Sequence, residues 1–192
     1  AYAVSPGVPT PLFEAPPAGK DPFAGIVAPT RPGDRLTLDI RWRVVRRPDR
    51  DYSVFVHLRD ESGLIVAQRD SYPQSGRAPT SDWRPADPPE ALDRLYPDRH
   101  VLQIPATAPA PCTCRLVYGV YDAATGTRLT TQTGADEVTL GYVMLTPHTD
   151  ARGIANPLDV PFGDDVVLQG YNLDRRAVPA GERLGLTLYW QT

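Results

Sequence analysis

The chain has 192 residues, of which 41% are hydrophobic and 22% are charged, so it holds enough apolar material for a packed core and is not disordered throughout. Its 22 prolines are more than twice the average usage, which excludes a helical bundle because proline interrupts helices. The net charge of -3 gives no indication of a nucleic-acid-binding protein, and no apolar run has membrane-spanning length.

Residues 1–30 are expected to form an extended, proline-rich lead-in. Seven prolines fall in this stretch, and its apolar residues follow neither the period of a strand nor that of a helix. Because the chain begins with Ala1 rather than Met, we expect a fragment or a processed product. No signal peptide is visible, since no basic segment precedes an apolar one there.

Residues 31–146 carry the pattern of a β-sandwich domain. Apolar and polar residues alternate strictly over 36–44, which is typical of a half-buried strand. Further short strands are predicted, in chain order, at 52–58, 64–68, 100–104, 115–121 and 138–145, with a short extended segment at 128–131. Short strands punctuated by turns predict an all-β fold, an immunoglobulin-like antiparallel β-sandwich of about seven strands.

The C-terminal residues contain an internal repeat. Residues 181–190 match residues 33–42 at a constant offset of 148, with Gly, Arg, the apolar strand positions and Trp in common. With a strand at 166–171, this predicts the first two strands of a second sandwich repeat over 164–192, after a linker at 147–163.

A two-stranded hairpin is not stable alone in water, so this second repeat needs a partner surface. We expect it either to pack on the first sandwich or to join a second chain in a homodimer. Trp42 and Trp190 stand at equivalent positions of the repeat, and both are expected in a core.

The order of motifs along the chain resembles a known family. The motifs are Pro32-Gly33-Asp34, Tyr52-Ser53-Val54-Phe55-Val56-His57-Leu58, Val66-Ala67-Gln68-Arg69-Asp70, Pro79-Thr80-Ser81-Asp82-Trp83-Arg84-Pro85, Asp98-Arg99-His100 and Thr125-Gly126. They resemble the β-sandwich repeats attached to bacterial polytopic membrane glycosyltransferases of the dolichyl-phosphate-mannose mannosyltransferase-like type. The resemblance covers residues 31–145 and again 162–192.

This resemblance implies a non-catalytic, extracytoplasmic accessory module of a membrane-anchored protein in the cell envelope. The module would bind a glycan or another envelope component, or position the enzyme. The catalytic acids of such enzymes lie in the membrane part, so this segment is expected to be no enzyme, and to meet the membrane only through other parts of the parent protein.

The sequence departs from the family at Cys112-Thr113-Cys114, where the resemblance implies Gly-Thr-Tyr, with the tyrosine acting as a tyrosine corner. On one strand, the Cα atoms of two such cysteines lie about 6.6 Å apart, near the upper limit for a disulfide. We therefore predict two free thiols. A lone Cys-x-Cys pair is too little for a structural zinc site.

No catalytic residue, metal or cofactor is predicted. The chain lacks a Gly-x-Ser-x-Gly nucleophile motif and a glycine-rich phosphate loop. The three histidines, His57, His100 and His148, lack the spacing of metal ligands. An enzyme would need an acid–base pair assembled by folding, such as His100 meeting a loop acid.

Ligand-binding potential concentrates in the connection at 70–98, which carries six prolines and a predicted helical turn at 89–95. Aromatic rings beside arginines can stack on sugars and bond their hydroxyl groups. The candidate ligand-binding residues are Tyr72, Trp83, Arg84, Arg94 and Tyr96.

Two functional interpretations of this connection are open. A binding module should leave Trp83 and Tyr96 accessible in a concave patch. The alternative is a structural or interaction repeat that stacks or dimerises through sheet edges and binds no ligand. In that alternative Trp83 plugs the open end of the sandwich and is buried.

Overall fold

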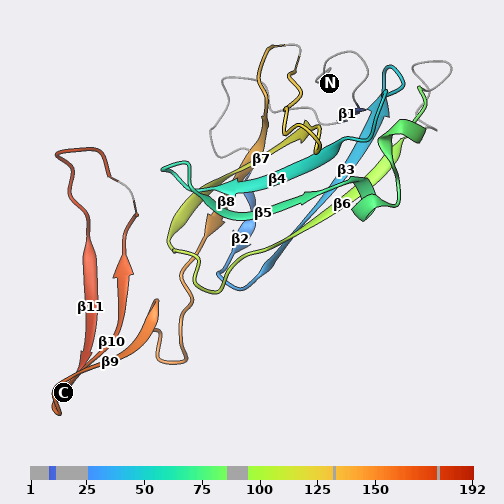
Figure 1. Ribbon diagram of the computed structural model, residues 1–192. Coiled ribbons are helices and arrows are strands. Elements are labelled where there is room, and N and C mark those ends of the chain that lie inside the picture. The colour runs from blue at the N-terminus through green and yellow to red at the C-terminus, as the bar shows by residue number, and fades with distance from the viewer. Residues whose placement is uncertain (1–8, 12–25, 86–94, 132, 177) are drawn as a thin grey trace.

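The computed structural model describes residues 9–11, 26–85, 95–131, 133–176 and 178–192, and within them the chain is all-β with several antiparallel sheets (Figure 1). The predicted lead-in at 1–30 falls largely outside these residues, as does the helical turn predicted at 89–95. Two short strands of the lead-in are described, β1 (Pro9–Pro11) and β2 (Ile26–Thr30). No helix in the described part is long and apolar enough to span a membrane.

The first sheet has the order β1-β3-β6 and is antiparallel. Its central strand β3 (Arg35–Val44) pairs with β6 (Tyr96–Gln103) along most of its length. As the alternation predicts, Leu36, Ile40 and Trp42 are buried while the residues between them are more exposed. This sheet therefore turns one apolar face inward.

The second sheet has the order β2-β8-β7-β4-β5. Strands β4 (Ser53–Arg59) and β5 (Ile65–Ser71) form a hairpin, and β7 (Cys112–Tyr121) pairs with both β4 and β8 (Val138–Leu145). The pairs are antiparallel except for β2 with β8, which run parallel. The segment 128–131, expected to be short and extended, pairs with the end of β7 through an isolated bridge between Tyr121 and Arg128.

The apolar faces of these two sheets share one core, consistent with a β-sandwich. At its centre, the ring of Trp42 on β3 lies 6.0 Å from Tyr118 on β7, edge to face. The most deeply buried side chains come from both sheets; they include Ile40, Trp42, Val54, Val56, Leu58, Leu102, Leu116, Val143 and Leu145.

The C-terminal residues form a third antiparallel sheet, which lies apart from the sandwich (Figure 1). Its order is β11-β10-β9, with β9 (Pro157–Phe162), β10 (Val166–Leu173) and β11 (Leu186–Gln191). The linker predicted at 147–163 is wrong at its end, because 157–162 is strand β9. Its prolines suggest a linker, but β9 is an edge strand, where proline is tolerated.

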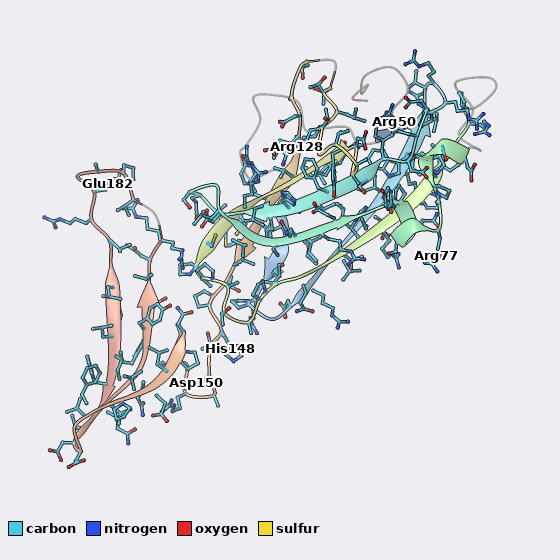
Figure 2. All side chains as sticks on the ribbon, viewed as in Figure 1. Arg50, Arg77, Arg128, His148, Asp150 and Glu182 are labelled. Atoms are coloured by element: carbon cyan, nitrogen blue, oxygen red, sulfur yellow. The ribbon has the colours of Figure 1, made fainter. Side chains whose placement is uncertain are left out.

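A tight connection joins this sheet to the sandwich, and it carries His148 and Asp150 (Figure 2). The side-chain amide of Asn156 donates hydrogen bonds to the carbonyl oxygens of Ala110, at 3.2 Å, and Tyr171, at 3.3 Å. Gly170 lies so close to Ile154 that an added Cβ would be 2.5 Å from its side chain. Glycine is therefore required where β10 passes the connection.

Candidate functional site

Trp83, the central residue of the predicted binding loop, is buried in the sandwich. Only 2% of it is exposed, and its ring stacks on Tyr96 at 4.6 Å with an interplanar angle of 9°. It also lies 6.4 Å from the ring of Trp42. The loop places it there through the short 3-10 helix η2 (Thr80–Asp82), whose buried Thr80 donates a hydrogen bond to the carbonyl oxygen of Arg50. A buried Trp83 is what the structural alternative requires.

The other candidate ligand-binding residues do not form one accessible patch with Trp83. The hydroxyl of Tyr96 accepts a hydrogen bond from the backbone N–H of Arg84 at 2.8 Å. The Arg84 guanidinium donates to the carbonyl oxygens of Ser81 and Trp83, both at 3.1 Å. Tyr72 is 41% exposed, and Arg94 lies outside the described residues. Among the four described candidates, Tyr72 alone is exposed.

A buried carboxylate organises the polar part of the core. Asp98 Oδ2 accepts hydrogen bonds from Trp42 Nε1 at 3.2 Å and from His100 Nε2 at 2.8 Å. Its Oδ1 accepts one from the backbone N–H of Gln74 at 2.8 Å. Burial alone would raise the pKa of Asp98, but these hydrogen bonds and the His100 charge outweigh it and hold that pKa below its ordinary value.

Folding thus brings His100 next to an acid, but that acid is Asp98, two residues away on β6. Residues i and i+2 of a strand share a face, so this pairing could have been found from Asp98-Arg99-His100. Neither side chain has any exposed surface. A substrate therefore cannot reach the pair, and the geometry makes it part of the core rather than an acid–base site.

The 3-10 helix η1 (Pro73–Gly76) is held against this carboxylate in a left-handed conformation. Gln74 and Ser75 have φ of 52° and 56°, which side chains other than glycine rarely adopt. Beside η1 lies an open hollow of about 590 Å³. Polar groups of Arg41, Gln74 and Arg77 line it, and Arg77 projects from this end of the molecule (Figure 2). The hollow can offer hydrogen bonds to a polar ligand.

The remaining histidines show no metal site. His57 is buried on β4, where its Nε2 lies 3.1 Å from a carboxylate oxygen of Asp70 and its ring 4.8 Å from Phe55. His148 lies in the connection to the third sheet. Across the described part of the chain, no group of three or more His, Cys, Asp or Glu side chains could hold a metal ion.

The two cysteines on β7 are free thiols, as predicted, and both are buried. Their sulfur atoms share a hydrogen bond at 2.9 Å, and the Cys112 thiol also lies 3.4 Å from a carboxylate oxygen of Glu61. The hydrogen bond with Cys114, together with burial and the negative charge of Glu61, raises the pKa of the Cys112 thiol far above its ordinary value. Cys112 therefore lacks the thiolate that a reactive cysteine needs, and Cys114 is buried.

The third sheet presents a continuous apolar face. Residues paired across an antiparallel sheet lie on the same face, and the pairs Leu168–Trp190, Leu168–Val160 and Phe162–Val166 are all apolar. The rings of Phe162 and Trp190 meet edge to face at 5.5 Å. We call this surface the C-terminal apolar face; it comprises Leu158, Val160, Phe162, Val166, Leu168, Tyr171, Leu173, Leu186, Leu188 and Trp190.

The two copies of the internal repeat differ in burial. In the first copy Ile40 and Trp42 are at most 1% exposed, whereas the equivalent Leu188 and Trp190 are 44% and 48% exposed. The expectation of a core position for Trp190 is therefore wrong. Of the two partner surfaces expected for this repeat, the first sandwich leaves most of the face uncovered, because the third sheet stands apart (Figure 1). At the near end of the face, Leu158 and Tyr171 line a hollow together with residues 106–109 of the sandwich.

Sequence reasoning missed the β9 part of this face. The alternation of Leu158, Val160 and Phe162 is the pattern of a strand, but Pro157 and Pro161 in the same segment favoured a linker.

A scan against models of protein families, a search of curated proteins and a search of solved structures each gave no match.

Proposed function

We propose that this chain is a non-catalytic accessory module of a membrane glycosyltransferase-like protein, acting outside the cytoplasm as a structural and interaction repeat. The observation that carries this proposal is the repeated strand pattern. Its apolar side chains are buried in a core in the first copy, whereas in the second copy they are exposed. A tandem module with an open apolar face is suited to stacking against a partner. The family and the location come from the resemblance of the motifs.

The strand order supports an immunoglobulin-like arrangement of the first repeat. In that fold, strands B and E pair in one sheet, while strands C, F and G form the other. Here β3 pairs with β6, and β4, β7 and β8 lie together in the second sheet, with β5 beside β4. These six strands take the places of B, C, C′, E, F and G in chain order, with β1 and β2 supplying the leading strand of each sheet.

The burial of Trp83 favours the structural role over glycan binding. A sugar platform needs an exposed aromatic ring, whereas the Trp83 ring is covered by Tyr96 on one side and packs near Trp42. Glycan binding is the second candidate. The observation that favours it is the polar hollow beside η1, where Gln74 and Arg77 offer hydrogen-bond donors.

Titration calorimetry with oligosaccharides of N-acetylglucosamine and of mannose separates the two candidates. The structural role predicts no saturable heat for the 192-residue chain. Arg77→Ala serves as the matched variant, because Arg77 lines the hollow and is exposed. A saturable heat that is present in the wild type and lost in this variant would establish glycan binding and overturn the structural role.

A further inference from the structure

We infer that the C-terminal apolar face is a dimerisation surface, and that the same face of a second copy of this chain covers it. This inference rests on the proposed structural and interaction role, to which it adds the surface, the partner and the geometry. Four observations support it. The face holds no charged side chain, and its strand β11 repeats the pattern of the buried strand β3. The inner faces of the sandwich are already covered, and the exposed apolar area is large enough for a specific interface.

The C-terminal apolar face holds no charged side chain. Asp159 on β9 alternates with Leu158 and Val160, so it lies on the opposite face of the sheet. Arg175 and Glu182 pair with each other at 2.8 Å in the loop between β10 and β11. Two copies can therefore approach through this face without burying an unpaired charge, which would otherwise oppose association.

The internal repeat indicates what kind of surface lies opposite. In the first copy of the pattern, Trp42 is covered by the facing sheet, where it meets Tyr118 on β7. Sheets of a sandwich pack face to face at about 10 Å through such side chains. Leu188 and Trp190 carry the same pattern in β11, so the surface that suits them is the apolar face of another β-sheet.

The sandwich of the same molecule cannot supply that sheet. The inner face of β2-β8-β7-β4-β5 is already covered by β3, and Val56 and Leu58 have no exposed surface. Among the described sheets, the C-terminal apolar face is the continuous apolar face left open. In a solution of this chain, the matching surface is therefore the same face of a second molecule, related by a two-fold axis.

The exposed area suits a specific but moderate dimer. Six large apolar side chains of the face are each between 39% and 56% exposed. With their partly exposed neighbours they present roughly 700 Å² per copy, so a pair would bury about 1,400 Å², within the range of specific interfaces. Phe162 and Trp190 form the aromatic anchor that such interfaces favour.

Sedimentation velocity of the 192-residue chain, from micromolar to several hundred micromolar, tests the inference. We expect the mass to rise from 21.0 kDa toward twice that value. Leu188→Glu places a charge in the C-terminal apolar face and should weaken association by about 100-fold. Thr187→Glu is the matched control: its neighbouring position on β11 is exposed and faces the opposite side, so its dimer should persist.

Acrylamide quenching of tryptophan fluorescence gives a second measurement on the same samples. Trp42 and Trp83 are buried in the sandwich, so the quenchable emission comes from Trp190. Quenching should fall several-fold on dimerisation, and Trp190→Phe should remove the quenchable component at every concentration.

Two results would overturn the inference: a monomer with quenchable Trp190 at all concentrations, or a dimer that survives Leu188→Glu. Either could occur while the chain still binds no saccharide, so the structural role would stand. Saccharide binding by an intact dimer would instead overturn the proposed function alone.

Discussion

The indole N–H of Trp42 donates a hydrogen bond to the buried carboxylate of Asp98, at 3.2 Å, across the two paired strands of the first sheet. The same carboxylate accepts hydrogen bonds from His100 and from the backbone of Gln74. The Asp98 carboxylate therefore links one of the two buried tryptophans to helix η1, whose Gln74 and Ser75 have positive φ. Because a carboxylate only accepts hydrogen bonds, His100 carries its proton on Nε2.

Replacing this carboxylate should destabilise the fold. Asp98→Asn keeps the shape but puts an amide donor among three donors, so we expect the free energy of unfolding to fall by about 3 kcal/mol. Urea unfolding followed by tryptophan fluorescence measures it. Asp39→Asn is the control, since Asp39 pairs with Arg99 on the exposed face of the same two strands and its loss should barely move the midpoint. Equal effects of the two variants would contradict the central role of Asp98.

The depressed pKa of Asp98 predicts acid sensitivity. A carboxylate that is more acidic in the folded than in the unfolded state stabilises the fold fully above its ordinary pKa of 3.8. That contribution is lost as the pH falls from about 4 through the lower folded pKa. The melting temperature measured against pH should therefore drop in this window. Asp98→Asn should flatten the drop, and an unchanged slope in the variant would refute the assignment.

Trp83 should contribute to stability rather than to binding. Trp83→Ala removes a fully packed ring from between Tyr96 and the core, and we expect a loss of about 4 kcal/mol in the free energy of unfolding. Tyr72→Ala, on an exposed ring of the same connection, should cost less than about 0.5 kcal/mol. Chemical denaturation compares the two. A negligible cost for Trp83→Ala would mean that its ring is available for another role.

Cys112 and Cys114 should be unreactive in the folded protein. Both thiols are buried, and the raised pKa of Cys112 removes its nucleophilic thiolate. A thiol reagent at pH 8 should label them at least about 100-fold faster in denaturant than in buffer. Mass spectrometry should count two labels per chain after unfolding. Rapid labelling of the folded chain, or a mass lower by two hydrogen atoms before labelling, as in a disulfide, would contradict this.

The strands were predictable where their pattern is local. The alternation over 36–44 requires no knowledge of the rest of the chain, because side chains on a strand point to alternate faces. It correctly predicts that Ile40 and Trp42 turn inward. The repeat at 181–190 was visible for the same reason, and it predicted strand β11.

Local patterns failed where the context of the strand mattered. Proline at 157 and 161 indicates a linker by residue type, yet β9 tolerates both because it lies at a sheet edge. The burial of Trp83 could not be predicted either, because a loop residue is buried or exposed according to how the sheets that its loop connects pack together. The pairing of His100 with Asp98 is readable from their spacing, but their complete burial is not.

The sharpest contrast lies between residues 33–42 and 181–190, which share one pattern and differ in burial. Their alternation of apolar and polar side chains sets the strand and its apolar face in both copies. Whether that face is covered depends on what lies opposite, which is a relation between distant segments. Strand β3 faces β7 and β4, so Trp42 is buried, whereas β11 faces no described element, so Trp190 is left for a partner.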